Sequence, residues 1–415
     1  MAKIHPFKGL RPLPDKVEKI ASPPYDVLNS TEAREMAKEN EFSFLHVVKP
    51  EIDLPESTHI YDDAVYQKGK DNLQKLISEG HMKQDEKPTY YIYKQIMGDY
   101  EQVGLVVCAS IEDYENDIIK KHEHTRAEKE TDRVKHVETL NANTGPVFLT
   151  YKARKDIDDM IAAFISQNKP TYDFTADDEV KHIFWTLEDD ALVEKITREF
   201  AEIDYLYVAD GHHRSASGTI VGQKRRSANP NHTGEEEYNF FLSVLFPHDQ
   251  LHIMDYNRVV KDLNGLSKEE FLQNVKNDFI IESVSDNKPY KPEAMHNFGM
   301  YLDGKWYKLT AKPESFDAKD PVSSLDVAIL QNNLLSPILG IGDPRKDNRI
   351  DFVGGIRGLE HLAKRVDEGE AVAFSMYPTT IEQLMAIADA GKVMPPKSTW
   401  FEPKLRSGLI VHLLD

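Results

Sequence analysis

The sequence contains a single cysteine, Cys108, in 415 residues. It also has no apolar run that approaches the roughly 18–20 residues of a transmembrane helix. One cysteine excludes an internal disulfide framework and fits a reducing compartment. The start, MAKIHPFKGLRPLPDK, has no apolar signal-peptide core, so we expect a cytoplasmic protein without a membrane partner. Cys108 lies in the apolar stretch VGLVVCAS, which predicts a buried and inert thiol.

Positive charge is scarce, since 51 Lys and Arg face 70 Asp and Glu and give a formal net charge of −19. Nonspecific duplex binding needs a basic face, so we expect no nucleic-acid partner. The basic residues that are present gather in residues 120–136 and 391–406. Basic clusters in an acidic protein suit a small anionic substrate, although solvated surface faces are the commoner cause of such clusters.

The order of strand and helix patterns predicts a mixed α/β fold. Short apolar runs rich in β-branched or aromatic residues predict strands at YYIYKQI, VGLVVCAS, PVFLTY, YLYVA and FFLSVLF. Helical periodicity appears in AVYQKGKDNLQKLISEG, DIDDMIAAFISQ and DDALVEKITREFA. Strands interleaved with helices are typical of α/β or α+β architecture.

A turn followed by a helix start in KDLNGLSKEE places a domain boundary near residue 265. We therefore expect a core domain with an N-terminal extension over residues 1–265 and a C-terminal α/β region over 266–415. In the second part, MYLDGKWYKL predicts a hairpin with Asp303-Gly304 in the turn. Helical segments are expected around 323–338, 356–367 and 379–390, and SGLIVHLL is expected to be a closing strand.

The stretch YLYVADGHHRSASGTI, residues 205–220, carries the densest set of reactive groups: Asp210, Gly211, His212, His213, Arg214 and Ser215. A strand, a tight glycine turn and a helix start would aim free backbone amides and partial positive charge at one point. Phosphates bind readily at such places, and Arg214 supplies a bidentate fork. Asp210 and the two histidines can move a proton or hold a metal. The alternative is a polar turn before a capped helix.

A second group comprises His122, Glu123, His124, Arg126 and Arg133, followed by His136. The segment HEHT predicts a loop or strand end that presents both imidazoles, and the basic residues after it predict a helix. The group suits a phosphate or a metal, although the His-Glu-x-x-His pattern of metalloproteases is absent. An exposed charged helix would explain it equally simply.

Three further segments offer single candidates. Asn143 and Thr144 precede a Gly-Pro turn and a strand, where they could orient a substrate or simply form the turn. Asp26 follows Ser22-Pro23-Pro24, an extended segment, and a structural turn is the alternative to a site role there. Lys397 follows two prolines and could contact phosphate, although no Walker glycine pattern precedes it.

Several motifs together resemble a bacterial family called domain of unknown function 1015, from about residue 6 to 412. They are RPLPDKVEKIASPPYDVLN, HEHT, NANTGPVFLTY, ADGHHR, DYNRVV and MPPKSTWFEPKLRSGL. The strand–DGHHR–helix core also resembles the ParB/sulfiredoxin-like superfamily. Gly211, His213 and Arg214 match the Gly, His and Arg of the sulfiredoxin phosphate loop, and His212 stands where those proteins carry cysteine.

The superfamily resemblance implies a ParB/sulfiredoxin-like core with a phosphate loop, and it includes ADP-dependent free-serine kinases with an acidic base. The leading hypothesis is therefore a phosphotransferase that uses ADP or ATP with Mg²⁺ on free serine or phosphoserine. Arg126, Arg133 or Lys397 would neutralise charge, and Glu123, Asp26 or Asp210 would position or deprotonate a hydroxyl. A metal-dependent hydrolase that uses the histidines and a non-enzymatic nucleotide-responsive binding protein are the alternatives. The sequence indicates no oligomeric state.

Overall fold

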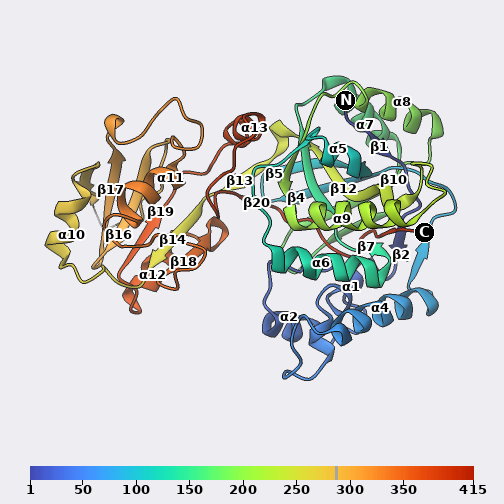
Figure 1. Cartoon of the computed structure of the whole chain (residues 1–415), viewed down its shortest axis with the longest axis horizontal. Helices are drawn as coiled ribbons and strands as arrows, with labels where there is room; N and C mark the ends of the chain where they lie inside the picture. Colours follow the sequence, from blue (N-terminus) through green and yellow to red (C-terminus); the bar gives the residue numbers. More distant parts are fainter. Residues whose placement is uncertain (286–287) are drawn as a thin grey trace. The chain divides into compact units, whose positions relative to one another are not determined.

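The computed structural model describes residues 1–285 and 288–415 (Figure 1). The chain forms two compact units. Unit 1 comprises Met1–Leu251 and Pro403–Asp415, and unit 2 comprises His252–Glu402. Residue 265, where the sequence analysis places a boundary, lies in unit 2 between β14 (Tyr256–Val260) and α10 (Lys268–Val275).

Unit 1 is built on a mixed sheet, which in the described residues has nine strands in the order β6-β11-β8-β12-β5-β4-β10-β9, with β1 paired to β5. The strands are β1 (Ile4–His5), β4 (Tyr91–Met97), β5 (Tyr100–Ser110), β6 (Ile119–Lys120), β8 (Val147–Tyr151), β9 (Tyr172–Thr175), β10 (Lys181–Thr186), β11 (Leu206–Asp210) and β12 (Phe240–Pro247). All five strands predicted from apolar runs are confirmed here. They read as continuous apolar runs because both faces of the sheet are covered.

The helices of unit 1 bury an apolar face against this sheet or against one another. They are α1 (Val17–Ile20), α2 (Ser30–Ala37), α3 (Leu45–Val48), α4 (Asp63–Ser78), α5 (Ile111–Glu115), α6 (Ala127–Leu140), α7 (Lys155–Gln167), α8 (Asp190–Phe200) and α9 (His212–Ala228). The three periodic segments correspond to α4, α7 and α8. Helices α6 and α9 pack together through Val134, Val137 and Val221, as their neighbouring ribbons in Figure 1 show.

The C-terminal segment of unit 1 returns to the start of the chain. Leu10 and Val411 exchange backbone hydrogen bonds of 2.9 and 2.8 Å, and Ser22 and Ser407 exchange bonds of 3.0 and 2.9 Å. Strand β21 (His412–Leu413) pairs with β7 (Ala142–Asn143). The predicted closing strand is thus confirmed at its end, and its first residues are joined to the N-terminal segment by isolated bridges.

Unit 2 contains a six-stranded sheet in its described residues, in the order β15-β17-β16-β19-β14-β18. Its strands are β14, β15 (Phe279–Ser283), β16 (Asn297–Leu302), β17 (Lys305–Ala311), β18 (Ile350–Gly354) and β19 (Val372–Ser375). The predicted hairpin is β16–β17, and Asp303 and Gly304 both take the positive φ that its turn needs. The helical segments are α10, α11 (Asp326–Leu330), a π-helix over Gln331–Leu335, α12 (Leu359–Asp367) and α13 (Ile381–Asp389).

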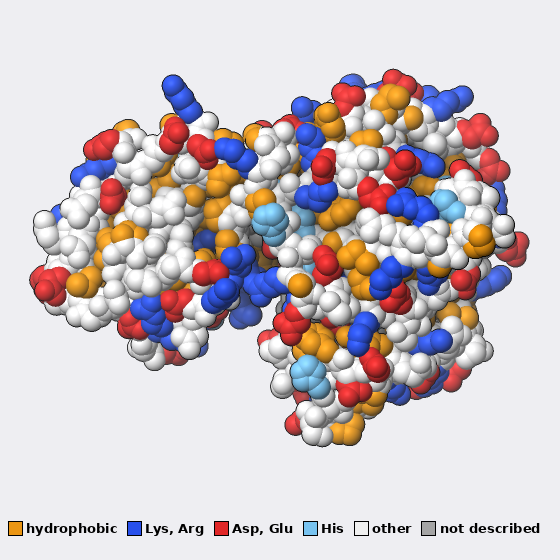
Figure 2. Space-filling model, in the orientation of Figure 1, with side chains coloured by type: hydrophobic (Ala, Val, Ile, Leu, Met, Phe, Trp, Pro, Cys, Tyr) orange, Lys and Arg blue, Asp and Glu red, His pale blue; other side chains and the backbone are white. Residues whose placement is uncertain are grey.

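Two short strand pairs lie outside these sheets: β13 (His252–Met254) with β20 (Trp400–Glu402), and β2 (Leu10–Pro12) with β3 (Met82–Gln84). Figure 2 shows acidic and basic side chains interspersed on the face of unit 1 that it presents. In residues 1–285 and 288–415, no helix combines the length and apolar character that a bilayer crossing requires.

Candidate functional site

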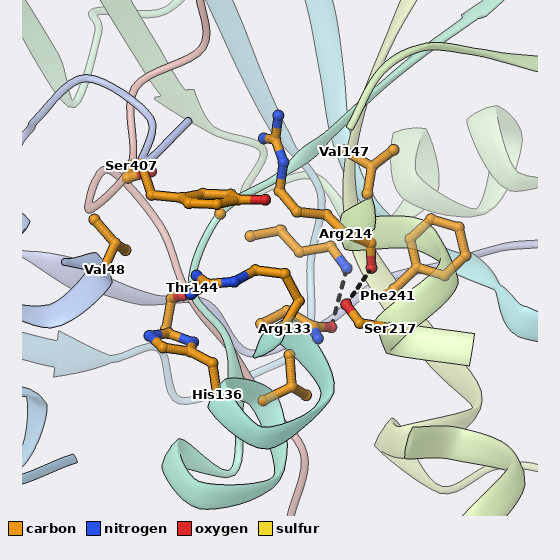
Figure 3. Close-up of a pocket in the computed structure, with 14 residues that line it drawn as sticks. Val48, Arg133, His136, Thr144, Val147, Arg214, Ser217, Phe241 and Ser407 are labelled. Carbon is orange, nitrogen blue, oxygen red and sulfur yellow. Dashed lines mark hydrogen bonds between the residues drawn. The ribbon is translucent and has the colours of Figure 1, made fainter. Parts of the chain in front are cut away.

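A small cavity in unit 1 is lined by segments that lie far apart in the sequence (Figure 3). Its volume of about 30 Å³ is enough for one or two water-sized groups. The lining residues are Tyr25, Val48, Arg133, His136, Val137, Asn143, Thr144, Gly145, Val147, Arg214, Ser217, Phe241, Leu242 and Ser407. We call it the Arg214 cavity. Four of the motifs noted in the sequence contribute to its wall, namely SPPYD, NANTGP, ADGHHR and the C-terminal KLRSGL.

Arg214 brings a buried positive charge to this cavity, since its side chain is only 11% exposed. Its Nη1 donates to the carbonyl oxygen of Pro146. Its Nη2 lies 3.6 Å from Asp26 Oδ2 and 3.7 Å from Asp210 Oδ2, which is beyond ordinary hydrogen-bond distance. The buried Nε has no hydrogen-bond partner in the described part of the chain. The guanidinium therefore keeps donor capacity for a further acceptor.

The backbone at Gly211 explains why a glycine stands beside Arg214. Gly211 has a φ of 98°, in the left-handed region, and precedes the first turn of α9. A Cβ on this residue would lie 3.2 Å from Arg214 Cζ. Since Gly211 has no side chain to cap the helix, the first amides of α9 lack an intrahelical acceptor and carry partial positive charge. The strand, glycine turn and helix start expected from the sequence are confirmed.

Asp210 ends β11 and is surrounded by cations. Its Oδ1 accepts from the Gly211 amide at 2.9 Å, and Lys404 Nζ lies 3.4 Å from its Oδ2. Burial would raise the pKa of this carboxyl, but the charges of Lys404 and Arg214 outweigh burial and hold its pKa well below the ordinary value. Asp210 is thus a fixed negative charge and a weak base.

Lys404 is a site residue that sequence reasoning missed. From the basic stretch 391–406 the sequence indicates Lys397 as the candidate. Lys397 lies in unit 2, where its Nζ is 5.5 Å from the ring centroid of Tyr256. The residue types of FEPKLRSGL give no signal that Pro403 begins the segment that returns to unit 1.

Arg133 lies on α6 and is the second cation of the cavity wall. Its Nε and Nη2 each lie 2.8 Å from Asp132 Oδ2, and its guanidinium stacks 4.2 Å from the centroid of the Tyr25 ring. Tyr66 donates to the other oxygen of Asp132 at 3.0 Å. Arg133 is therefore neutralised and fixed, whereas Arg214 has only more distant carboxylates.

One histidine from each of the two motifs meets in a buried pair, and burial lowers the pKa of both imidazoles. His122 and His212 are buried, with Nε2 atoms 3.3 Å apart and rings edge to face. Burial lowers the pKa of His122 to about 4 and the pKa of His212 well below its usual value. Burial also lowers the pKa of His213, whose buried Nδ1 has no partner in the described residues. His136 donates to the Val47 carbonyl at 3.0 Å, and burial lowers its pKa to about 3.

The remaining predicted residues take different places. Ser215 is buried inside α9, where its hydroxyl donates to the His212 carbonyl at 3.0 Å, and Ser217 lines the cavity instead. Asn143 and Thr144 line the cavity, and Asn143 Oδ1 accepts from the Leu242 amide at 3.2 Å.

Asp26 is 37% exposed and faces Arg214. Glu123, His124 and Arg126 are exposed residues before α6 and do not line the cavity. Within the described residues, no three His, Cys, Asp or Glu side chains gather as a metal-binding group.

Comparison with known proteins places the chain in a family. No curated protein matches the sequence. Among solved structures, a free serine kinase mutant in complex with AMP is similar at 11% identity and a TM-score of 0.38, covering 72% of this chain and 86% of the other. The corresponding ADP complex gives 12% identity, a TM-score of 0.37, and 72% and 87% coverage. SbnI with a C-terminal truncation, from Staphylococcus aureus, is 11% identical with a TM-score of 0.38. This match covers 73% of this chain and 85% of the other.

A sequence-family model matches residues 4–328 of the chain. The chain belongs to the family described as protein of unknown function (DUF1015).

Proposed function

We propose that the Arg214 cavity binds a phosphate group of ADP or ATP and that the protein transfers a phosphoryl group to or from the hydroxyl of a small metabolite. The observation that carries the proposal is the buried guanidinium of Arg214, whose Nε lacks a partner among the described residues. It lies at the uncapped N-terminus of α9. Backbone amides, helix dipole and guanidinium together favour a phosphate there.

The groups around the cavity suit phosphoryl transfer, which depends mainly on positioning and electrostatic stabilisation. Arg214 and the first turn of α9 would stabilise charge on the transferred phosphoryl group. His213 is neutral at pH 7 and has an unpartnered Nδ1 in the described structure, so it can accept the hydroxyl proton. Asp26 is the second candidate for this role, because it faces Arg214 and is partly exposed.

The proposal includes a magnesium ion bound beside Arg214. Mg²⁺ is bound in proteins through one or two carboxylates together with substrate phosphates. Asp26 and Asp210 both face the guanidinium of Arg214 and would supply these carboxylates. When bound, the ion would neutralise phosphate charge. Serine is the first hydroxyl substrate to test, because the superfamily resemblance of the DGHHR segment implies it.

The test compares Arg214→Ala with Arg198→Ala, an exposed arginine on α8, by titration calorimetry with ADP and ATP in the presence of Mg²⁺. Losing charge-assisted hydrogen bonds should weaken binding by about 10- to 100-fold in the first variant and leave it unchanged in the second. Phosphorus NMR of the protein with nucleotide and serine then tests transfer.

Unchanged nucleotide affinity in Arg214→Ala would contradict the proposed site. Binding that depends on Arg214 but is accompanied by no transfer to any small hydroxyl compound would instead favour the nucleotide-responsive binding protein.

A further inference from the structure

Unit 2 contains a much larger cavity, with a volume of about 490 Å³. This falls within the roughly 300–1,000 Å³ that is usual for small-molecule sites. Apolar side chains of Val327, Leu335, Phe352 and Pro395 form much of its wall. Ser323, Gln331 and Asn332 add polar groups. We call it the Arg258 cavity, after the charged residue in its wall.

Arg258 lies on β14 and is only 3% exposed. Its Nη1 donates to the carbonyl oxygen of Tyr256 and its Nη2 donates to the carbonyl oxygen of Lys397 at 2.9 Å. Within residues 1–285 and 288–415, no carboxylate lies within ion-pair distance of this guanidinium. Burial lowers the pKa of Arg258 to about 10, which still leaves the side chain charged at pH 7. A buried cation without a counter-charge is costly unless a ligand supplies one.

The segment Pro395–Ser398 holds this guanidinium in place. Lys397 has a φ of 60°, which a residue with a Cβ rarely adopts, and its carbonyl accepts from Arg258. Ser398 Oγ donates to the Pro395 carbonyl at 2.6 Å, and Thr379 donates to the Ser398 carbonyl at 2.9 Å. Backbone in a sparsely populated region is often retained where a site requires it.

Another part of the cavity wall also has irregular backbone. Gln331, Asn332 and Leu335 belong to the π-helix that follows α11. Short π-helical segments are rare and occur frequently at functional sites. Gln331 donates to the Ile341 carbonyl at 2.7 Å and thereby fixes the loop that carries Asp343 and Arg345. Two segments with unusual backbone, Pro395–Ser398 and Gln331–Leu335, therefore contribute to the wall of the same cavity.

The charges around the cavity sum to one unpaired positive charge. Arg345 donates to both oxygens of Asp343, at 3.0 and 3.1 Å, so this rim pair adds no net charge. Arg258 is the remaining charged side chain of the cavity wall. A single buried cation matches a monoanion, whereas a phosphate dianion would leave excess negative charge against apolar walls.

We propose that the Arg258 cavity binds a small organic carboxylate, with the carboxylate on Arg258 and an apolar body against Val327, Leu335 and Phe352. This site is separate from the Arg214 cavity and does not depend on the phosphotransferase proposal. The ligand class follows from the volume, the single unpaired guanidinium and the apolar wall.

The test is titration calorimetry of the full chain with phenylacetate and with phenylacetamide, which has a similar shape but no charge. The wild type should bind phenylacetate at one site and phenylacetamide at least about tenfold more weakly, because hydrogen bonds to an ionised acceptor are stronger. Arg258→Met should abolish this preference. Arg357→Met is the matched control and should retain it, because Arg357 is exposed and does not line the cavity.

Asn332→Trp provides a second variant in case Arg258→Met does not fold. Asn332 is exposed at the rim, so a tryptophan there should obstruct the cavity without replacing a buried residue. Both compounds should then bind more weakly. The proposal is overturned if phenylacetate does not bind at millimolar concentration, if it binds no better than its amide, or if Arg258→Met keeps the wild-type preference.

Discussion

The charges of Arg133, Arg214 and Arg258 are balanced in different ways, and the binding roles that we propose for Arg214 and Arg258 rest on this difference. Arg133 contacts Asp132 at 2.8 Å and is neutralised. Arg214 has carboxylates only at 3.6 and 3.7 Å, and Arg258 has two main-chain carbonyls. The sequence could indicate Arg214, because a glycine turn and reactive groups surround it. Arg258 stands in YNRVV, where neither burial nor the missing carboxylate is visible from residue types.

Gly211→Ala tests whether the glycine positions Arg214. The new Cβ would lie 3.2 Å from Arg214 Cζ at a φ of 98°, so we expect a loss of about 1–2 kcal/mol in unfolding free energy and weaker ADP binding. Gly234→Ala is the matched control, because Gly234 has a φ of 93° with no atom within 4 Å of its Cβ position. In urea unfolding it should lose a similar amount of unfolding free energy, but its ADP affinity should equal that of the wild type. Equal ADP affinity in both variants would disprove the positioning role.

Acid should destabilise unit 1 through its buried histidines. The folded-state pKa values of about 4 for His122 and about 3 for His136 lie below the unfolded value of 6.5. The unfolded chain therefore binds more protons as the pH falls below 6.5, and stability is lost from there down to the folded pKa. Each histidine contributes on the order of 3 kcal/mol over this window. His122→Gln should flatten the dependence of urea unfolding on pH between 6.5 and 4, and an unchanged slope would contradict the buried neutral imidazole.

At the scale of elements, local patterns identified the strands of the unit 1 sheet and the β16–β17 hairpin. Strands β4, β5, β8, β11 and β12 are apolar runs, and the start of α9 follows its glycine turn. Strand pairings between segments far apart in the sequence could not be predicted from it. β21 pairs with β7, and Ser407 pairs with Ser22, because the tertiary fold brings these short polar segments together. A two-residue strand has too few residues to show a period.

Removal of the C-terminal segment 408–415 should prevent ligand binding in the Arg214 cavity. In a chain that ends at Ser407, His412 no longer pairs with Asn143 and Val411 no longer bonds to Leu10. Because Asn143 and Thr144 line the cavity, we expect loss of ADP binding and a lower thermal midpoint. A chain ending at Leu414 lacks only the exposed Asp415 and serves as the control. Wild-type ADP affinity in the shorter chain would show that the cavity does not need residues 408–415.

At the scale of the whole molecule, the chain forms two units, and each contains a cavity with a buried arginine in its wall. The mixed α/β class predicted from the order of elements is confirmed. The division at Leu251 and the return at Pro403 were not visible, because no linker composition marks either position. Lys397 and Lys404, seven residues apart, belong to different units for this reason.

The most direct measurement of the central claim is a crystal structure of the protein with ADP and Mg²⁺. We expect a phosphate group of the nucleotide within hydrogen-bond distance of the Arg214 guanidinium and the first amides of α9. Nucleotide bound away from residues 210–214, with Arg214 closed onto Asp26 and Asp210, would contradict the phosphate site and the phosphotransferase function proposed from it.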